Sequence, residues 1–196
     1  KAILKGVDIP TEAQSSYVIY RPLGVIFGVM PWNFPFWQVF RFAAPALMAG
    51  NAIIIKHAPN VQGVAQAIET LAIDAGLPDG LFSNLRVEVP QIPAIIADRH
   101  IAAVTLTGSD RAGRSVARIA GESLKKVVLE LGGSDPAIVL SDANLDTAIP
   151  LILKGRMLNG GQTCCAIKRV LIQRNIYPEF KARFIDAVAK LKVGAP

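Results

Sequence analysis

The sequence predicts an α/β fold, with a doubly wound and mostly parallel sheet followed by the start of a second α/β domain. From about Val25, short runs of β-branched residues alternate with longer segments of helical periodicity, which is the pattern of βαβ units. Hydrophobic residues make up 52% of the chain, which is ample for a packed core. No apolar run is long enough to span a membrane, because charged residues, glycine, proline and asparagine interrupt each one.

The elements are expected in a regular order along the chain. Residues 16–21 alternate apolar and polar side chains without a following helix, so we expect one strand of a separate sheet there. In the βαβ region we expect strands at residues 24–30, 52–56, 81–84, 102–106 and 126–130. We expect its helices at residues 36–48, 61–75, 92–98 and 110–120. A new α/β unit begins after Gly133, with strands at residues 137–140 and 169–173 and helices at residues 145–158 and 177–192.

Charge and cysteine content limit the classes of function. The formal net charge is +6, but the Lys and Arg residues are scattered and no basic cluster is interleaved with aromatic residues, so nucleic acid is not an expected partner. A modest positive field would still favour the phosphates of a nucleotide cofactor. The two cysteines are adjacent, which argues against a secreted disulfide framework and favours a reducing cytoplasm.

Two further features bound the interpretation. His57 and His100 have no clustered ligands at metal spacing, so we expect no metal site. The chain begins at Lys1, shows no signal-peptide pattern and ends at Pro196 just after a predicted helix. We therefore expect a fragment of a soluble protein that does not interact with membranes.

A glycine-rich cysteine is the first candidate site. Cys164 follows Gly160–Thr163, whose small and polar residues leave access for a substrate and backbone N–H groups for an oxyanion. As a thiolate, Cys164 would be a competent nucleophile. Taken alone, the pattern is more typical of a buried structural thiol. We interpret Cys165 as a small packing residue, because adjacent cysteines form strained disulfides.

Two polar residues lie in apolar surroundings. Glu130 ends a predicted apolar strand and precedes two glycines, so burial would raise the pKa of its carboxyl and suit it to general-base catalysis. An ordinary exposed glutamate at a strand end is the alternative. Asn33 stands among aromatic rings and prolines, where its amide needs a partner if it is buried. That partner is either a developing oxyanion or a neighbouring backbone carbonyl.

Aromatic residues and a strand-to-helix junction provide two more candidate sites. Six aromatic residues within eleven positions either wall a pocket or pack in the core: Trp32, Phe34, Phe36, Trp37, Phe40 and Phe42. The run Thr107-Gly108-Ser109 ends a predicted strand and opens a helix, where free N–H groups and the helix dipole favour a phosphate. Alternatively, Ser109 only caps that helix.

Taken together, these motifs occur in the order found in the aldehyde dehydrogenase family, which the chain resembles over essentially its whole length. The motifs are Pro31-Trp32-Asn33-Phe34-Pro35, Thr107-Gly108-Ser109 with Gly113, Leu129-Glu130-Leu131-Gly132-Gly133, and Gly161-Gln162-Thr163-Cys164. Glu130 and Cys164 are 34 positions apart, as are the base and the nucleophile of that family. Within the family, the chain is most similar to the succinate-semialdehyde dehydrogenases, through Arg41, the run from Lys56 to Asn60, and the run from Leu129 to Pro136.

The resemblance implies a Rossmann-like architecture and a mechanism. Residues 1–22 would be part of an oligomerisation sheet, 23–132 the NAD(P)-binding domain and 133–196 the first part of the catalytic domain. In the implied reaction, Cys164 attacks the aldehyde, and the Asn33 side chain and the Cys164 backbone N–H hold the oxyanion. After hydride transfer to the nicotinamide, Glu130 activates the water that hydrolyses the thioester. A homodimer or homotetramer is implied for the full-length protein.

Cofactor contacts also follow from the resemblance. The implied residues are Trp32, Lys56, Gly108, Ser109, Gly113 and Leu131, with Lys56 at the adenosine ribose and Leu131 close to the nicotinamide. Many NAD-preferring relatives carry a glutamate three residues after that lysine, where this chain has Pro59, so repulsion against a 2′-phosphate is absent. The usual glycine after Asn84 is missing from residues 85–88. We therefore predict that both NAD and NADP are used.

The expected substrate is an aldehyde with a terminal carboxylate, succinate semialdehyde. Phe34, Trp37 and Arg41 recur at intervals of three and four residues, which places them on one helix face at the aldehyde entrance. The Arg41 guanidinium can grip a carboxylate with two hydrogen bonds, and the similar enzymes carry an arginine at the same offset from the asparagine. Alternatively, Arg41 pairs with a surface acid.

Two other functions remain open on the sequence. A related enzyme could pass the acyl group to phosphate or coenzyme A, although such relatives generally lack the glutamate present here as Glu130. A non-catalytic protein could keep the fold without turnover. Because the family's chains continue well past Pro196 and complete the active site there, we expect these 196 residues alone to be inactive.

Overall fold

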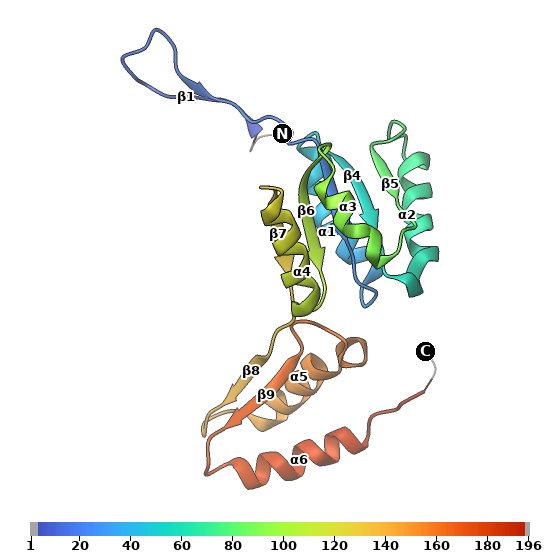
Figure 1. Ribbon diagram of the computed structural model, residues 1–196. Helices are drawn as coiled ribbons and strands as arrows, with labels where there is room; N and C mark the ends of the chain where they lie inside the picture. The colour runs from blue at the N-terminus through green and yellow to red at the C-terminus, as the bar shows by residue number, and fades with distance from the viewer. Residues whose placement is uncertain (1–3, 195–196) are drawn as a thin grey trace. The chain divides into compact units, whose positions relative to one another are not determined.

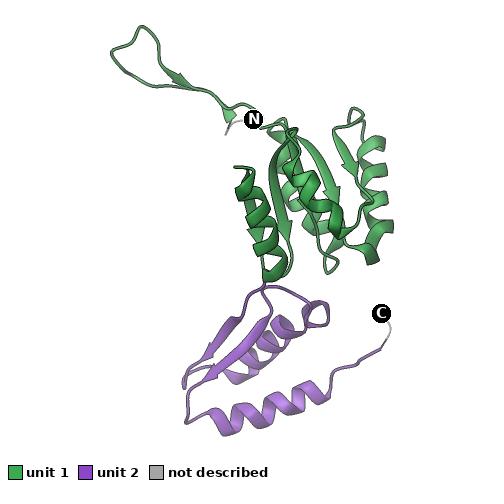
Figure 2. Cartoon of the chain, in the orientation of Figure 1, with its two compact units in different colours: residues 1–131 green, residues 132–196 purple. Residues whose placement is uncertain are grey.

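The computed structural model describes residues 4–194, which contain helices, 3₁₀ turns and three small sheets (Figure 1). The chain divides into two compact units, Lys1–Leu131 and Gly132–Pro196 (Figure 2). Within residues 4–194, no helix has both the length and the apolar character needed to cross a membrane.

A five-stranded parallel sheet forms the centre of the first unit. Its order is β5-β4-β3-β6-β7, and every neighbouring pair runs parallel. The strands are β3 (Val25–Val29), β4 (Ala52–Lys56), β5 (Phe82–Asn84), β6 (Ile101–Thr107) and β7 (Lys126–Glu130). After β3 the chain builds one side of the sheet, and with β6 it returns to the other side. The crevice at the carboxyl ends of β3 and β6 is therefore the switch point where ligands bind in such folds.

Helices cover both faces of this sheet, so the predicted doubly wound α/β class is confirmed. The helices are α1 (Pro35–Met48), α2 (Gln62–Asp74), α3 (Ile92–Ala97) and α4 (Asp110–Glu122), with 3₁₀ turns η2 (Pro59–Val61) and η3 (Val89–Gln91). Helices α1 and α2 pack with β4 in one core cluster, and α3 and α4 pack with β6 in the other. Ile53 and Ile55 of β4 are fully buried, and each such burial contributes roughly 1.5–3 kcal/mol.

A glycine in the central strand brings α1 close to the sheet. An added Cβ at Gly28 of β3 would lie 2.4 Å from the ring of Phe42. Phe42 therefore packs where any other residue at position 28 would collide. This close approach fixes α1, the helix that carries the predicted substrate-binding residues.

The amino-terminal segment forms a small antiparallel hairpin. Strand β1 (Val7–Asp8) pairs with β2 (Tyr17–Val18). The predicted strand at residues 16–21 is thus shorter than expected, and β1 was not predicted, because two residues between Gly6 and Pro10 give no periodic signal. Val7, Tyr17 and Val18 are all exposed.

The second unit is a further α/β arrangement. Strand β8 (Asp135–Val139) pairs in parallel with β9 (Ile167–Ile172), and α5 (Leu145–Met157), η4 (Leu158–Gly161) and α6 (Tyr177–Ala189) complete the unit. Its core contains Val139, Leu145, Ile149, Ile152 and Phe180. Both strands begin two residues before their predicted starts. Pro136 obscures the beginning of β8, although proline is tolerated in a strand at a sheet edge.

Candidate active site

Five of the predicted site residues of the first unit lie where strands of its sheet end. They are Asn33 after β3, Lys56 at the end of β4, Gly108 and Ser109 after β6, and Glu130 at the end of β7. These positions are far apart in sequence, and the parallel topology gathers them because carboxyl ends of parallel strands share one edge. The structure therefore places the predicted oxyanion donor, base and cofactor contacts at the switch point.

Glu130 is the last residue of β7 and pairs with Arg41. Its Oε1 lies 2.9 Å from the Arg41 Nη1, and its side chain is 48% exposed. The burial expected from the apolar strand is not observed, because β7 is the edge strand of this sheet and its alternate residues face outward. The backbone oxygen of Glu130 accepts a hydrogen bond of 3.0 Å from the Gly108 N–H. The β6 junction is thus tied to the backbone of the predicted base.

Arg41 joins α1 to the ends of two strands. Besides the ion pair with Glu130, its Nη2 donates to Thr107 Oγ1 at 3.4 Å. Its Nε is buried and has no hydrogen-bond partner among the described residues. Arg41 thus pairs with an exposed acid, which is the alternative that the sequence left open, and this acid is the candidate base itself.

The predicted substrate face of α1 is only partly covered. Phe34 is the N-cap residue of the helix and is half-buried, while Trp37 is 62% exposed. Arg41 is half-buried, and the opposite side of α1 is buried through Val39 and Ala43. Trp37 and Arg41 therefore lie on the side of α1 opposite these buried residues. Phe34 precedes the helix, with φ −137° and ψ 72°, so the predicted helix face does not include it.

A buried histidine holds the segment around Asn33. His57 follows β4 and is fully buried. Its Nδ1 accepts from the Ala58 N–H at 2.9 Å, so Nε2 carries the proton and donates to the Pro35 carbonyl oxygen at 2.9 Å. Burial lowers the pKa of His57, and the charge of Lys56 lowers it further, while the Pro35 contact acts in the opposite direction. Sequence reasoning considered His57 only as a metal ligand and missed this positioning contact two residues after Asn33.

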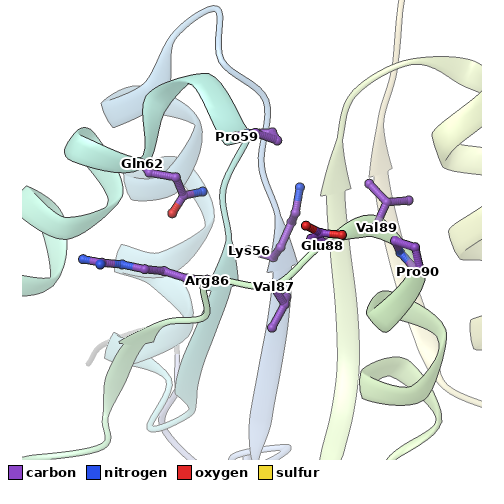
Figure 3. A pocket seen from close by; sticks show the side chains of 8 residues that line it. All are labelled: Lys56, Pro59, Gln62, Arg86, Val87, Glu88, Val89 and Pro90. Carbon is purple, nitrogen blue, oxygen red and sulfur yellow. The ribbon is translucent and has the colours of Figure 1, made fainter.

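A cavity of about 470 Å³ lies beside the end of β4, lined by Lys56, Pro59, Gln62 and residues 86–90 (Figure 3). Lys56 is 5% exposed, and burial lowers the pKa of its ammonium group. Gln62 donates to the carbonyl oxygens of His57 and Ala58, and its Oε1 is buried without a partner among the described residues. Figure 3 shows Arg86 extending away from Lys56; its Nη2 donates to Gln66.

This cavity has the chemistry that an adenosine requires. Pro59, Val87, Val89 and Pro90 supply apolar walls, and the other lining residues are Lys56, Gln62, Arg86 and Glu88. Lys56 supplies a donor for a ribose hydroxyl. The residues present therefore fit the adenosine half of NAD or NADP.

The junction between β6 and α4 combines a helix cap with close packing. The Ser109 hydroxyl accepts from the Ala112 N–H at 3.3 Å, so Ser109 does cap α4. This capping leaves the positive end of the helix dipole available to a phosphate. Gly113 is buried, and an added Cβ would lie 2.6 Å from Leu131 Cδ2. Close packing thus explains why position 113 is glycine, and a cofactor contact by Gly113, Leu131 or the 45% exposed Trp32 stays a prediction.

In the second unit, Cys164 lies in a turn between η4 and β9. Its side chain is half-buried, and both Cys164 and Cys165 are free thiols. Cys165 is exposed, so it does not pack as predicted. The buried residues of this turn are instead Thr163 and Ala166, on either side of the cysteine pair.

Several contacts fix this turn. Lys168 Nζ donates to the Cys164 carbonyl oxygen at 2.7 Å and to the Thr163 carbonyl oxygen at 3.3 Å, while the Thr163 hydroxyl donates to the Leu158 carbonyl oxygen at 3.0 Å. An added Cβ at Gly133 would lie 3.1 Å from the Cys164 carbonyl oxygen. Lys168 could not be identified from the sequence, because a lysine in a strand usually extends into solvent.

The backbone before Cys164 needs its glycines. Asn159, Gly160 and Gly161 have φ values of 53°, 62° and 78°, in the left-handed region that favours glycine. At Gly161, an added Cβ would also lie 3.1 Å from the Arg156 carbonyl oxygen. No group of three or more His, Cys, Asp or Glu residues that could hold a metal ion occurs within residues 4–194.

Comparisons with known proteins complete the description. The model of the aldehyde dehydrogenase family matches residues 2–196. The chain is 49% identical over 195 residues to the succinate semialdehyde dehydrogenase (NAD(P)+) of Escherichia coli strain K12, covering 100% of this chain and 42% of that protein. It is 50% identical over 184 residues to succinate-semialdehyde dehydrogenase (NADP(+)) 1 of Mycobacterium tuberculosis strain H37Rv, covering 94% of this chain and 40% of that protein. The chain thus spans about two fifths of these relatives.

The fold of this chain is also similar to that of a solved structure. The succinic semialdehyde dehydrogenase of Streptococcus pyogenes in complex with NADP+ has a TM-score of 0.93 and 37% sequence identity to this chain. The match covers 97% of this chain and 42% of that one.

Proposed function

This chain belongs to the aldehyde dehydrogenase family, and on that premise we propose that the full protein oxidises succinate semialdehyde to the dicarboxylic acid with NAD+ or NADP+. The predicted family resemblance is confirmed by the family match and by relatives at about 50% identity. The observation that carries the substrate assignment is Arg41. Its guanidinium lies at the carboxyl edge of the sheet, within ion-pair distance of the proposed base.

The proposed reaction begins at Cys164. Its sulfur attacks the aldehyde carbon, and the carbonyl oxygen becomes an oxyanion that accepts hydrogen bonds from the Asn33 amide and the Cys164 N–H. The aldehyde C–H bond then breaks, and NAD+ or NADP+, held by Lys56 and the amino end of α4, would supply the acceptor for the hydride. What remains on the enzyme is a thioester of Cys164.

Hydrolysis of this thioester needs a base. Water attacks the thioester carbon while the Glu130 carboxylate takes one of its protons. The C–S bond breaks, the carboxylic acid leaves, and the Cys164 thiolate is restored. Coenzyme A or phosphate would replace water in the acyl-transferring alternative, for which neither the site nor the named relatives offer support.

The cofactor proposal rests on the cavity beside Lys56. Lys56 would hold the adenosine ribose, and the amino end of α4 would hold the pyrophosphate. Pro59 stands where many NAD-preferring relatives carry a glutamate, so the Glu88 carboxylate is the only acid that lines the cavity among the described residues. Both NAD and NADP are therefore accepted. The names of the two curated relatives, NAD(P)+ for one and NADP(+) for the other, support this proposal.

The substrate proposal rests on α1. Arg41 would bind the terminal carboxylate of succinate semialdehyde, and Phe34 and Trp37 would flank its carbon chain.

We further propose that the full protein is a homodimer or homotetramer, because the hairpin β1–β2 exposes apolar side chains that a second subunit can cover. Light scattering on the full-length protein tests the assembly.

The function is tested with the full-length protein and a panel of aldehydes differing in terminal charge. We expect NAD(P)H formation with succinate semialdehyde, without coenzyme A or phosphate. A strict requirement for coenzyme A would contradict hydrolysis, and absence of turnover with every aldehyde would contradict the function.

A further inference from the structure

The ion pair between Arg41 and Glu130 engages two groups that the proposed function uses for different purposes. Arg41 Nη1 and Glu130 Oε1 are 2.9 Å apart, and Arg41 Nη2 donates to Thr107 Oγ1 at 3.4 Å. Thr107 and Glu130 are register partners on β6 and β7, so the arginine bridges two neighbouring strand ends. The fold therefore brings the two side chains together, and the contact with Thr107 helps to orient the guanidinium.

This arrangement restrains the base. The ion pair engages Oε1 and directs the whole Glu130 carboxylate toward α1. A general base must instead direct a lone pair of either oxygen at the attacking water. While the ion pair persists, the Glu130 carboxylate is turned toward Arg41. Hydrolysis of the thioester is slow in that state.

The restraint is easy to release. The two side chains are 35% and 48% exposed, and exposed ion pairs are weakly held because water competes for both charges. A second carboxylate that binds the guanidinium competes with Glu130 for the same positive charge.

We propose that Arg41 couples substrate recognition to water activation, because it holds Glu130 when no ligand carboxylate is present and releases it when the substrate's own carboxylate binds. This inference rests on the proposed function. It adds that the carboxylate of the substrate accelerates hydrolysis as well as binding. Aldehydes that lack a carboxylate leave Glu130 restrained and turn over slowly after acylation.

The test replaces succinate semialdehyde by two separate molecules, acetaldehyde for its aldehyde end and acetate for its carboxylate end. It uses the full-length enzyme. Acetate should raise the kcat for acetaldehyde about fivefold or more, the lower end of ordinary coupling between two ligands. Sodium chloride at equal ionic strength is the control and should not activate. Inhibition by acetate, or no effect, overturns the proposal.

Two variants sharpen the result. R41Q should raise the kcat for acetaldehyde without acetate and abolish activation by acetate, while the KM for succinate semialdehyde rises about tenfold or more. T107V should loosen the restraint partly, because the guanidinium loses its second anchor. A lower acetaldehyde kcat in R41Q, at an unchanged melting temperature, would show that Arg41 assists the base and would refute the proposal.

These outcomes are separable from failure of the proposed function. If the wild-type enzyme oxidises acetaldehyde but not succinate semialdehyde, the substrate proposal fails. The acetate experiment still measures whether a carboxylate raises the kcat for acetaldehyde. If R41Q does not fold, R41K keeps the charge but loses the forked geometry. In R41K, activation by acetate should be weaker than in wild type, and unchanged activation overturns the proposal.

Discussion

The turn around Cys164 and the end of strand β7 at Glu130 differ in how firmly they are held. The cysteine turn is fixed by two carbonyl contacts from Lys168, by the buried Thr163 hydroxyl and by a left-handed backbone that requires glycine. Glu130 is half exposed, and its side chain pairs with one arginine. The proposed nucleophile is thus held in a fixed turn, whereas the proposed base can change partners. This difference suits a reaction in which acylation needs fixed geometry and hydrolysis needs a base that acts later.

The largest effect should come from removing the nucleophile. C164A in the full-length enzyme should lower kcat by about 10³-fold or more, as expected for loss of a covalent catalyst. C165A is the matched control, because Cys165 is exposed beside it, and it should keep most of the activity. Steady-state NAD(P)H formation checks both variants, and equal losses would show that position 164 has no special role.

Loosening the cysteine turn should have the next largest effect. K168M removes both donors to the Thr163 and Cys164 carbonyl oxygens. We expect kcat to fall about tenfold or more at a nearly constant KM, because small displacements of a nucleophile are costly. K168R should restore part of the rate, and K181M on α6 is the charge-matched control. A changed KM with an unchanged kcat would contradict a positioning role.

The glycine requirement of the turn can be tested by stability. G161A should destabilise the protein by about 1–3 kcal/mol, because alanine is strained at positive φ and its Cβ would meet the Arg156 carbonyl oxygen. G121A in α4 is the control with the opposite sign, since Gly121 is exposed, helical and unobstructed. It should leave stability unchanged or raise it by up to about 1 kcal/mol. Thermal denaturation measures both, and equal destabilisation would contradict strain in the turn.

The melting temperature should depend on pH through His57, which holds the segment around Asn33 by its hydrogen bond to Pro35. Burial lowers the pKa of His57 in the folded chain, so folding favours the neutral ring. An unfolded histidine titrates near pH 6.5, so this stabilisation is complete above about pH 6.5 and is lost as pH falls below it. H57Q should therefore show a shallower decline of melting temperature than wild type between about pH 6.5 and pH 5. Parallel curves would assign the acid sensitivity to other groups.

The smallest expected change concerns the cofactor. P59E places a carboxylate in the cavity beside Lys56, where it would repel a 2′-phosphate. The ratio of kcat/KM for NADP to that for NAD should fall about tenfold, which corresponds to about 1.4 kcal/mol. An unchanged ratio would place the 2′-phosphate away from position 59. A strict NAD preference in the wild-type enzyme would refute the dual use.

The strands of the main sheet could be predicted from the sequence, because central parallel strands are continuous apolar runs. Ala52–Lys56 and Lys126–Glu130 have the predicted ends, Phe82–Asn84 begins one residue later than predicted, and the other two strands of that sheet differ by one residue at each end. The hairpin strand Val7–Asp8 could not be predicted, because two residues carry no periodicity. The helix at residues 177–192 ends earlier, at Ala189, since the last residues extend past the packed core.

The sequence indicated which residues belong to the candidate site, but it did not indicate their ion-pair and hydrogen-bond partners. Arg41 and Glu130 are far apart in the chain, and only the sheet order and the packing of α1 bring their side chains to 2.9 Å. The contacts of Lys168 and His57 are bonds to backbone oxygens, which depend on tertiary structure and leave no residue-type signature. Burial of Glu130 was predicted from an apolar strand, but the strand lies at the sheet edge.

The contrast between a fixed nucleophile and a restrained base is tested most directly by rapid mixing of the full-length enzyme with acetaldehyde and cofactor. Fast acylation followed by slow hydrolysis should produce a burst of NAD(P)H close to one equivalent per active site, and R41Q or added acetate should raise the steady rate that follows. A reaction without a burst, at a steady rate that neither R41Q nor acetate alters, would contradict restraint of Glu130 by Arg41.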